Sequence, residues 1–449
     1  MDLREVELSD MLNAREARAS RQRELLEQCQ SPLISFTMNV AGPVKNSELI
    51  QKGYLEGLER LRMQMDCEGF SVLHFEEIRA FTGNEAFFAV DGPAREVKQL
   101  TCQIEETDEL GRLFDMDVLA PDGRKLDRSE LGLPLRKCLL CGGPAAECAS
   151  RRAHTVQELQ AHTREVLEGY FQRAFADKVA GLALRSLLYE VSVTPKPGLV
   201  DRANAGSHLD MDFYTFLRSA SSLTPWFREM TLTGICCTHE SPAAAFRTLN
   251  YAGRQAEQAM LRATGGVNAH KGAIFSMGLL CGAAGRLYGQ GTALNAESLL
   301  NECAALAEYS RRSASPRTAG ERFYQAHGVG GIRGEAAAGF PLVRELGRPL
   351  LKTLLAEGWS PDDAGGIVLL HLMANAGDTC LIARAGYERW KTLREQLRRT
   401  LAGEPRPGRE FRRALDEEFI RCGWSAGGCA DLLAICWMLL FLEEQDALI

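Results

Sequence analysis

Two aspartates separated by one residue are the first feature of this sequence with chemical potential. Asp115 and Asp117 lie in the run Gly-Arg-Leu-Phe-Asp-Met-Asp-Val-Leu, which a Pro-Asp-Gly turn follows. Because side chains alternate along a strand, both carboxylates would face one side, and Phe114, Met116 and Val118 the other. Adjacent carboxylates repel unless a cation lies between them, and Mg²⁺ prefers such hard oxygen ligands. The pattern predicts a magnesium site for phosphate chemistry; the alternative is an exposed strand edge.

A charged helix over residues 8–29 offers further groups for phosphate. Arg15, Arg18 and Gln22 are spaced i, i+3 and i+7, so they share one helix face. Such a run is usually a solvated surface. The functional alternative is a pair of guanidinium groups that bind phosphate.

Three cysteines and a histidine have a spacing that suits a metal ion. Cys138, Cys141, Cys148 and His154 are separated by two, six and five residues, and two glycines follow Cys141. A Cys-x2-Cys turn of this kind can ligate Zn²⁺, although the gap of six is shorter than in common zinc fingers. The two interpretations are a Cys3His zinc site and a set of packed thiols.

Polar residues interrupt apolar, helix-like sequence at five places in the second half of the chain. At the first, two prolines fix an extended segment that presents Lys196 to a phosphate. At the second, Asp212 is placed to cap the helix that follows, which leaves Asp210 as a candidate metal ligand. The alternative is that both acids only cap the helix.

The third place is the start of an apolar helix. Asn268 is positioned to cap it, so that His270 and Lys271 fall in the first turn, where the helix dipole favours anions. Three glycines then follow on one face, at Gly278, Gly282 and Gly285. Glycine costs helix stability, so we expect another backbone or a ligand to approach this face closely.

The fourth place is predicted to be a glycine-rich loop, His-Gly-Val-Gly-Gly-Ile-Arg-Gly-Glu, with His327, Arg333 and Glu335. It matches neither a Walker A loop nor a dinucleotide fingerprint, but its backbone amides suit a polyphosphate.

The fifth place is a helix on which His371, Asn375 and Asp378 are spaced to share one face, and a related Gly-Gly-Cys-Ala-Asp patch opens the last apolar helix. Each cluster alone is more often structural than catalytic. Together they predict a polar pocket in a helical bundle that holds a metal ion and a triphosphate.

Composition and periodicity divide the chain into two regions. Its 449 residues are enough for two or three domains, and 45% hydrophobic and 25% charged residues exclude a disordered or fibrous protein. Residues 1–165 mix turns with four short β-like runs, SPLISFTMNVAGP, GFSVLHFEE, NEAFFAVDG and GRLFDMDVLAPDG, which predicts an α+β domain. Residues 166–449 are helical and rich in Ala, Gly and Leu, which predicts an all-α domain.

Charge and hydropathy exclude two further classes. The net charge of −7 gives no basic excess for nucleic acid, and the longest apolar run, residues 432–442, is too short to cross a bilayer. The first residues carry acids where a secretion signal has an apolar core. We therefore expect a cytoplasmic protein with reduced thiols and without a membrane or nucleic-acid partner.

The first half resembles holo-citrate lyase synthase, the phosphoribosyl-dephospho-CoA transferase, in AREARASRQ, SFTMNVAGPVKNS, GRLFDMDVL and RKCLLCGGPAAECASRRAH. The resemblance implies a nucleotidyltransferase-like domain. In the implied reaction a serine of the citrate lyase acyl carrier subunit attacks a triphosphoribosyl-dephospho-CoA donor, and pyrophosphate leaves. The resemblance agrees with Asp115 and Asp117 as catalytic Mg²⁺ ligands. The candidate phosphate contacts are Arg15, Arg18, Lys45 and Arg112.

The second half resembles triphosphoribosyl-dephospho-CoA synthase in TPKPGLVDRANAGSHLDMDFYTFLRSA, GVNAHKGAIFSMGLL, HGVGGIRGEAAAGF, NAGDTCLIARAG and SAGGCADLLA. The resemblance implies that ATP and 3'-dephospho-CoA give the triphosphoribosyl donor and free adenine. Such glycosyl transfer needs a carboxylate near the developing ribosyl cation and groups that move protons.

The candidate residues of this second site fall into three roles. The acids that would bind a metal or stabilise the cation are Asp210, Asp212, Glu335 and Asp378. The proton-transfer candidates are His270 and His327. The candidate nucleotide contacts are Lys196, Gly198, Asp201, Asn268, Lys271, Gly272, Gly328, Arg333, Gly334, Arg384 and Gly428.

The sequence therefore predicts a bifunctional enzyme that makes the citrate lyase prosthetic group and attaches it. One alternative is that only the helical half is catalytic, and that the first half is a zinc-dependent docking module for the acyl carrier protein. Another is an unrelated ATP-dependent kinase or ligase, which would release ADP or AMP in place of adenine.

Overall fold

Two compact units make up the chain, residues 1–171 and 172–449. The structure is a computed structural model that describes residues 4–311, 327–403 and 406–444. Each unit has its own hydrophobic core. The division falls within α5 (Val156–Ser192), a single helix of 37 residues.

The first unit is built on a four-stranded antiparallel sheet in the order β2-β3-β1-β4. The strands coincide with the four β-like runs of the sequence: β1 (Leu33–Met38), β2 (Ser71–Ile78), β3 (Glu85–Asp91) and β4 (Phe114–Leu119). β4 lies at one edge and pairs with β1, so that Asp117 is opposite Ser35 and Asp115 is opposite Thr37. The predicted α+β class of this half is confirmed.

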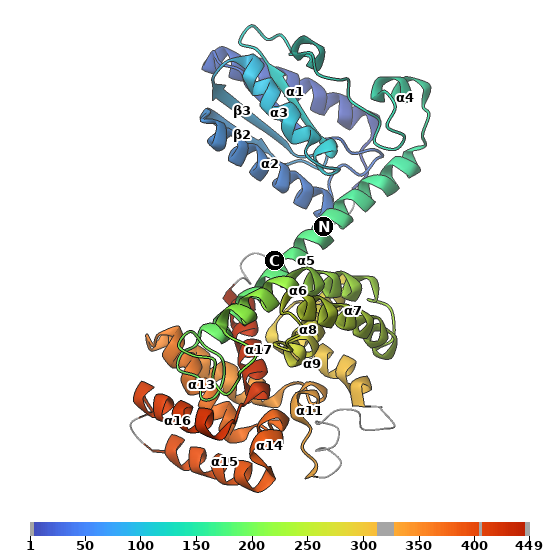
Figure 1. Ribbon diagram of the computed structural model, residues 1–449. Coiled ribbons are helices and arrows are strands. Elements are labelled where there is room, and N and C mark those ends of the chain that lie inside the picture. The colour runs from blue at the N-terminus through green and yellow to red at the C-terminus, as the bar shows by residue number, and fades with distance from the viewer. Residues whose placement is uncertain (1–3, 312–326, 404–405, 445–449) are drawn as a thin grey trace. The chain divides into compact units, whose positions relative to one another are not determined.

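Helices cover both faces of this sheet (Figure 1). They are α1 (Leu8–Cys29), α2 (Glu48–Glu68) and α3 (Ala94–Glu106), whereas the short α4 (Ala145–Arg151) buries no residue. On one face, α1 packs Leu25 and Leu26 against Leu33 and Phe87. On the other face, α2 and α3 enclose the larger core, where Phe36 stacks on Tyr54.

All the regular secondary structure among the described residues of the second unit is helical, as the sequence predicts. Besides the end of α5 its α-helices are α6 (Phe213–Cys236), α7 (Pro242–Ala263), α8 (Lys271–Gly289), α9 (Ala296–Ala307), α11 (Gly331–Ala337), α12 (Arg348–Ala356), α13 (Pro361–Asn375), α14 (Thr379–Ala385), α15 (Tyr387–Leu401), α16 (Arg409–Cys422) and α17 (Gly427–Glu444). α17 is buried from Leu432 to Leu442 and lies among the other helices of this unit (Figure 1).

Among the described residues no single helix has the length and apolar composition needed to cross a membrane. The pair α13 and α14, bent by 71° at the break between them, passes that test only as a pair and only by length and composition.

Glycines allow α6 and α8 to pack with their backbones in contact. A Cβ on Gly285 of α8 would lie 2.0 Å from the Thr231 carbonyl oxygen of α6, and one on Gly234 would lie 2.1 Å from the Gly282 carbonyl oxygen. No side chain fits at such distances. The expected close approach along the glycine face of α8 is therefore present, and the approaching backbone is that of α6.

Three local predictions were wrong. α8 begins at Lys271 with His270 at the N-cap position, so Asn268 does not cap it. The glycine-rich stretch is helical from Gly331 onward, because α11 begins there, and only its first part is a loop. The third error concerns the helix that was expected to contain Asp378.

α13 ends at Asn375, and the chain turns through 71° before α14 begins. Asp378 is the N-cap of α14, because its Oδ1 accepts hydrogen bonds from the N–H groups of Cys380 and Leu381. His371, Asn375 and Asp378 therefore do not share one helical face. A spacing of three or four residues cannot reveal a helix break that a capping side chain makes.

Candidate active sites

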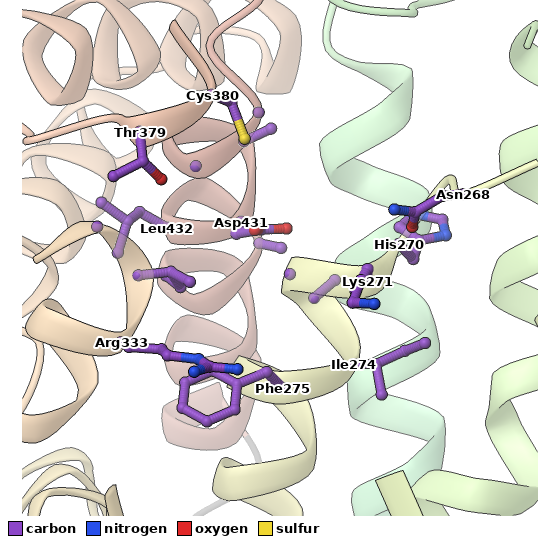
Figure 2. A pocket seen from close by; sticks show the side chains of 18 of the residues that line it. Asn268, His270, Lys271, Ile274, Phe275, Arg333, Thr379, Cys380, Asp431 and Leu432 are labelled. Atoms are coloured by element: carbon purple, nitrogen blue, oxygen red, sulfur yellow. The ribbon is translucent and has the colours of Figure 1, made fainter. Parts of the chain in front are cut away.

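A cavity of about 990 Å³ in the second unit brings together segments that are far apart in the sequence. Its walls include the loop after α5, the start of α8, α11, the start of α14 and the start of α17 (Figure 2). Twelve of the candidate residues line it: Lys196, Asp210, Asn268, His270, Lys271, Gly272, Arg333, Gly334, Glu335, Asp378, Arg384 and Gly428.

Three other candidates hold the surrounding loops instead of lining the cavity. Asp201 accepts hydrogen bonds from the N–H groups of Lys196, Ala203 and Asn204, and so ties the extended segment into a closed loop. Gly198 has φ +66°, and a Cβ there would lie 2.2 Å from the Trp424 carbonyl oxygen, so only glycine fits.

Asp212 caps α6, with its Oδ1 accepting from the N–H and hydroxyl of Thr215 at 2.8 and 2.6 Å. This is the capping role that the sequence predicts, and it engages one of the two carboxylate oxygens. His327 stacks on Tyr387 at 4.1 Å between ring centroids, and neither it nor Gly328 is part of the cavity wall.

Lys196 pairs with an acid that the sequence pattern did not single out. Its Nζ donates to Glu190 Oε1 near the end of α5, and both side chains are almost fully buried while lining the cavity. Burial raises the pKa of Glu190, and the Lys196 charge opposes that rise. An isolated glutamate in a long amphipathic helix gives no sequence signal for such a pair. The ammonium group is therefore held in place before any phosphate binds.

His270 is a buried, neutral imidazole. Its Nδ1 lies 2.7 Å from Ser219 Oγ, whereas its Nε2 is buried and has no hydrogen-bond partner among the described residues. Burial, together with the nearby charge of Lys196, lowers the pKa of His270 to about 3. The ring thus carries no charge at neutral pH, and one of its nitrogens has no hydrogen-bond partner among the described residues.

Asp431 is a carboxylate of the cavity that the sequence indicated only as the last residue of the Gly-Gly-Cys-Ala-Asp patch. Figure 2 shows it projecting from α17 toward the start of α8, where Lys271 begins the helix. It makes no hydrogen bond or ion pair with any other residue that the structure describes. Burial raises the pKa of Asp431 well above its ordinary value, and the charges of Glu190 and Asp378 add to the rise.

Asp378 and Glu335 also line the cavity but are tied to backbone groups. Asp378 Oδ2 accepts from the Cys429 N–H at 2.9 Å, so this side chain joins the starts of α14 and α17. Glu335 Oε2 accepts from the Leu342 N–H at 3.3 Å. Burial raises the pKa of both carboxyl groups. Asp431 and the exposed Asp210 are therefore the cavity acids with the fewest competing contacts.

Cations lie on two sides of the cavity. Arg333 on α11 has its guanidinium 5.7 Å from the ring centre of Phe275 (Figure 2). Lys271 at the start of α8 pairs with Glu257, and Arg384 donates to the Gly423 carbonyl oxygen at 3.2 Å. All three side chains are long enough to turn from these contacts to an anion.

In the first unit, Asp115 and Asp117 lie on the same face of β4, since Phe114, Met116 and Val118 are fully buried on the other. Each is partly exposed and accepts from one cation: Asp115 from Arg136 at 3.0 Å and Asp117 from Lys125 at 2.6 Å. One oxygen of each carboxylate has no partner among the described residues. The pair therefore fits a divalent cation by donor chemistry and by orientation.

The candidate phosphate contacts of this unit differ in availability. Arg18 is paired with Glu85 at 2.6 Å, and Arg112 donates to the Cys138 carbonyl oxygen at 2.6 Å. Burial lowers the pKa of Lys45, and the neighbouring charge of Arg15 lowers it further. Arg15 forms no ion pair within the described chain. Two cations held together without a carboxylate suit an anion.

The chain is a transferase with two units, because family models of two transferases match the two units. Residues 6–170 match the family CitX, apo-citrate lyase phosphoribosyl-dephospho-CoA transferase, and residues 176–448 match the family CitG, ATP:dephospho-CoA triphosphoribosyl transferase. The chain belongs to the CitXG family, in which these two enzymes are fused.

Relatives of the same organisation cover nearly the whole chain. Protein CitXG of Haemophilus influenzae is 34% identical over 96% of this chain and 95% of its own length, and Protein CitXG of Leuconostoc mesenteroides subsp. cremoris is 32% identical over 95% of each. The 2-(5''-triphosphoribosyl)-3'-dephosphocoenzyme-A synthase of Pectobacterium atrosepticum is 39% identical over 62% of this chain and 93% of its own length. The predicted bifunctional enzyme is thus confirmed at the level of its two transferase families.

Proposed function

We propose that the second unit joins the ribosyl triphosphate of ATP to 3'-dephospho-CoA and releases adenine. In this reaction the bond between the ribose anomeric carbon and adenine breaks. A bond from the same carbon to the 2'-hydroxyl oxygen of dephospho-CoA forms, and the proton lost by that hydroxyl balances the one gained by adenine. The observation that supports this proposal is that Lys196, His270, Arg333 and Asp431 line one and the same cavity.

The neutral, unpaired Nε2 of His270 is suited to exchange a proton with the hydroxyl or with adenine. Asp431 is suited to stabilise the positive charge that develops on the ribose, because it is a carboxylate with no other partner in a buried wall. Arg333, Lys271 and Arg384 are suited to the triphosphate. Lys196 is already paired with Glu190, so we assign it two roles. It holds Glu190 and the loop after α5 in place, and it contacts the phosphates.

A divalent cation would accompany the triphosphate in this cavity. The described wall carries five Lys and Arg side chains against six Asp and Glu side chains, so a triphosphate meets no excess of positive charge. Mg²⁺ commonly binds through one or two carboxylates and the phosphates of a substrate. Asp210 and Asp431 are the acids best placed to share it.

For the first unit we propose a nucleotidyltransferase-type reaction. A serine hydroxyl of the citrate lyase acyl carrier subunit attacks the phosphorus nearest the ribose, the bond to the next phosphate breaks, and pyrophosphate leaves. Mg²⁺ held by Asp115 and Asp117 would neutralise charge on that phosphate. Arg15 and Lys45 are suited to the departing pyrophosphate. ATP, dephospho-CoA and reduced thiols are all consistent with a cytoplasmic location.

Product analysis tests both reactions on one protein. Incubation with ATP and 3'-dephospho-CoA should release adenine, detected by chromatography, in amounts equal to the new triphosphoribosyl product. Release of ADP or AMP would instead indicate a kinase or ligase. With the carrier subunit added, mass spectrometry should find the prosthetic group on a serine and one pyrophosphate per modified carrier. An unmodified carrier in the presence of the purified precursor would favour the docking-module alternative.

A further inference from the structure

The first unit contains a cluster of four metal-ligating side chains, Cys138, Cys141, Cys148 and His154. Their donor atoms all lie within 4.8 Å of one another, and the Sγ atoms of Cys141 and Cys148 are 3.5 Å apart. Tetrahedral zinc, with Zn–S bonds of about 2.3 Å and a Zn–N bond of about 2.0 Å, places such ligands roughly 3.5–3.8 Å apart. The four donors are thus near the spacing that one zinc ion requires.

The backbone around the first two cysteines forms a tight turn that points both thiols to one side. The Cys138 N–H donates to the Gly143 carbonyl oxygen at 2.6 Å, and the Gly142 N–H donates to the Cys138 carbonyl oxygen at 3.2 Å. Gly142 has φ +72°, which favours glycine. α4 then carries Cys148, and the left-handed Arg152 (φ +47°) ends that helix, so that His154 returns to the thiols.

The segment from Asp127 to Thr155 has almost no hydrophobic core of its own. Cys138 is its only buried side chain among the described residues, and α4 buries none. His154 Nε2, by contrast, is a buried nitrogen without a hydrogen-bond partner. A segment that orders few apolar groups usually needs a disulfide or a metal ion to be stable, and the unpartnered nitrogen points to a missing ligand.

The same segment is bound to the carboxylate face of β4. Arg136, two residues before Cys138, donates to Asp115 Oδ1 at 3.0 Å and to the carbonyl oxygens of Arg112 and Phe114. Arg112 in turn donates to the Cys138 carbonyl oxygen at 2.6 Å. The fold of the cysteine turn therefore fixes the position of Arg136 beside Asp115.

We propose that the first unit binds one structural Zn²⁺ ion through these three cysteines and His154, and that the ion holds Arg136 beside Asp115. The ligand set is closed, with four protein donors, so the ion has no open position for substrate. Arg136 is then a positioning residue that orients Asp115. This second part rests on the transferase function proposed for the first unit.

Metal analysis of the full-length protein, purified without chelators, tests the site directly. We expect one zinc per chain in the wild type, none in Cys148→Ser, and one in Cys67→Ser, which changes an exposed cysteine outside the cluster. Cys148→His replaces the lost sulfur by a second nitrogen ligand and should retain zinc. A wild-type protein without zinc after growth with added zinc, or a Cys141–Cys148 disulfide found by mass spectrometry, would overturn the proposal.

The positioning role has a separate measurement. Cys148→Ser should lower the kcat for carrier modification about tenfold or more when the precursor is supplied, and Cys148→His should restore it. Adenine release by the second unit of the same protein should stay unchanged, which reports that the chain is intact. Full carrier modification by zinc-free protein would disprove the positioning role. Failure of zinc-loaded wild type to modify the carrier would instead refute the proposed transferase function and leave the metal site standing.

Discussion

The Asp431 carboxylate lies directly against Gly272 in the first turn of α8. A Cβ added to Gly272 would be 1.9 Å from Asp431 Oδ2 and 2.9 Å from its Cγ. Glycine at this position is therefore required for the carboxylate to keep its place in the cavity. Because the end of an aspartate side chain can rotate away, a larger residue would displace the carboxylate more readily than the helix.

We expect Gly272→Ala to lower the kcat of adenine release by about 10²-fold, since a shift of about 1 Å in a reacting group has effects of that size. The thermal unfolding temperature should change little. Gly253→Ala is the matched control, because Gly253 also lines the cavity but has its nearest neighbour at 3.9 Å. Steady-state kinetics of both variants check this, and equal rates would contradict the assigned place of Asp431.

Asp431→Asn should separate activity from stability. We expect adenine release to fall about 10²–10³-fold, as for the loss of a group that stabilises transition-state charge. Stability should rise at neutral pH. A carboxyl group whose pKa is raised by folding stabilises the fold below its unfolded pKa, and that contribution is lost as pH rises through the folded pKa.

The gain from Asp431→Asn should therefore be largest at neutral pH and shrink as the pH falls toward the ordinary aspartate pKa. Urea denaturation followed by tryptophan fluorescence measures it well. All five tryptophans lie in the second unit, at positions 226, 359, 390, 424 and 437. A variant that is less stable than the wild type at neutral pH would show that the Asp431 carboxylate supports the fold.

His270 should not titrate in the pH range where histidine usually does. With a pKa lowered to about 3 by burial, the imidazole stays neutral from pH 5 to 8. Any inflection near pH 6.5 in the wild-type profile of kcat for adenine release should therefore remain in His270→Gln. The variant should be slower at every pH. Because the folded pKa is depressed, the wild type should also lose stability relative to His270→Gln as the pH falls below about 6.5.

Strand periodicity correctly predicted that Asp115 and Asp117 lie on one face of their strand. The alternation from Phe114 to Val118 alone indicated which face each side chain takes, because a strand repeats every two residues whatever its neighbours are. The partners could not be predicted in this way. Arg136 and Lys125 reach the carboxylates from loops, and loops have no periodic pattern.

The sequence motifs predicted many residues of the cavity wall. They did not predict which charged side chains pair with each other, because those contacts depend on the tertiary structure. Glu190 lies six residues before Lys196, and the two meet because the loop after α5 folds back. The helix expected through Asp378 fails for the same reason, since a capping contact ends it. Asp431 carried one usable signal, an acid in an otherwise apolar helix.

Asp115→Asn and Asp117→Asn should each lower carrier modification by about 10²-fold or more, with purified precursor supplied. Adenine release should be unaffected, because the synthase cavity is built from residues of the second unit alone. Asp122→Asn, an exposed acid in the turn after β4, is the matched control and should keep both activities. Mass spectrometry of the carrier subunit gives the rate. If the Asp115 and Asp117 variants modified the carrier normally, a catalytic metal at this pair would be excluded.

Gly285→Ala should destabilise the second unit although it lies in a helix, where alanine is normally preferred. The new Cβ would lie 2.0 Å from the Thr231 carbonyl oxygen, which is backbone and cannot rotate away. Separating α6 from α8 to make room should cost about 1–3 kcal/mol, more than the roughly 1 kcal/mol that alanine gains in a helix.

Gly181→Ala in α5 is the control, because nothing lies within 4 Å of its added Cβ. We expect its unfolding temperature to stay equal or rise, and that of Gly285→Ala to fall by roughly 2–10 °C. Tryptophan fluorescence during heating measures both, and equal unfolding temperatures would show that α6 and α8 are not in backbone contact.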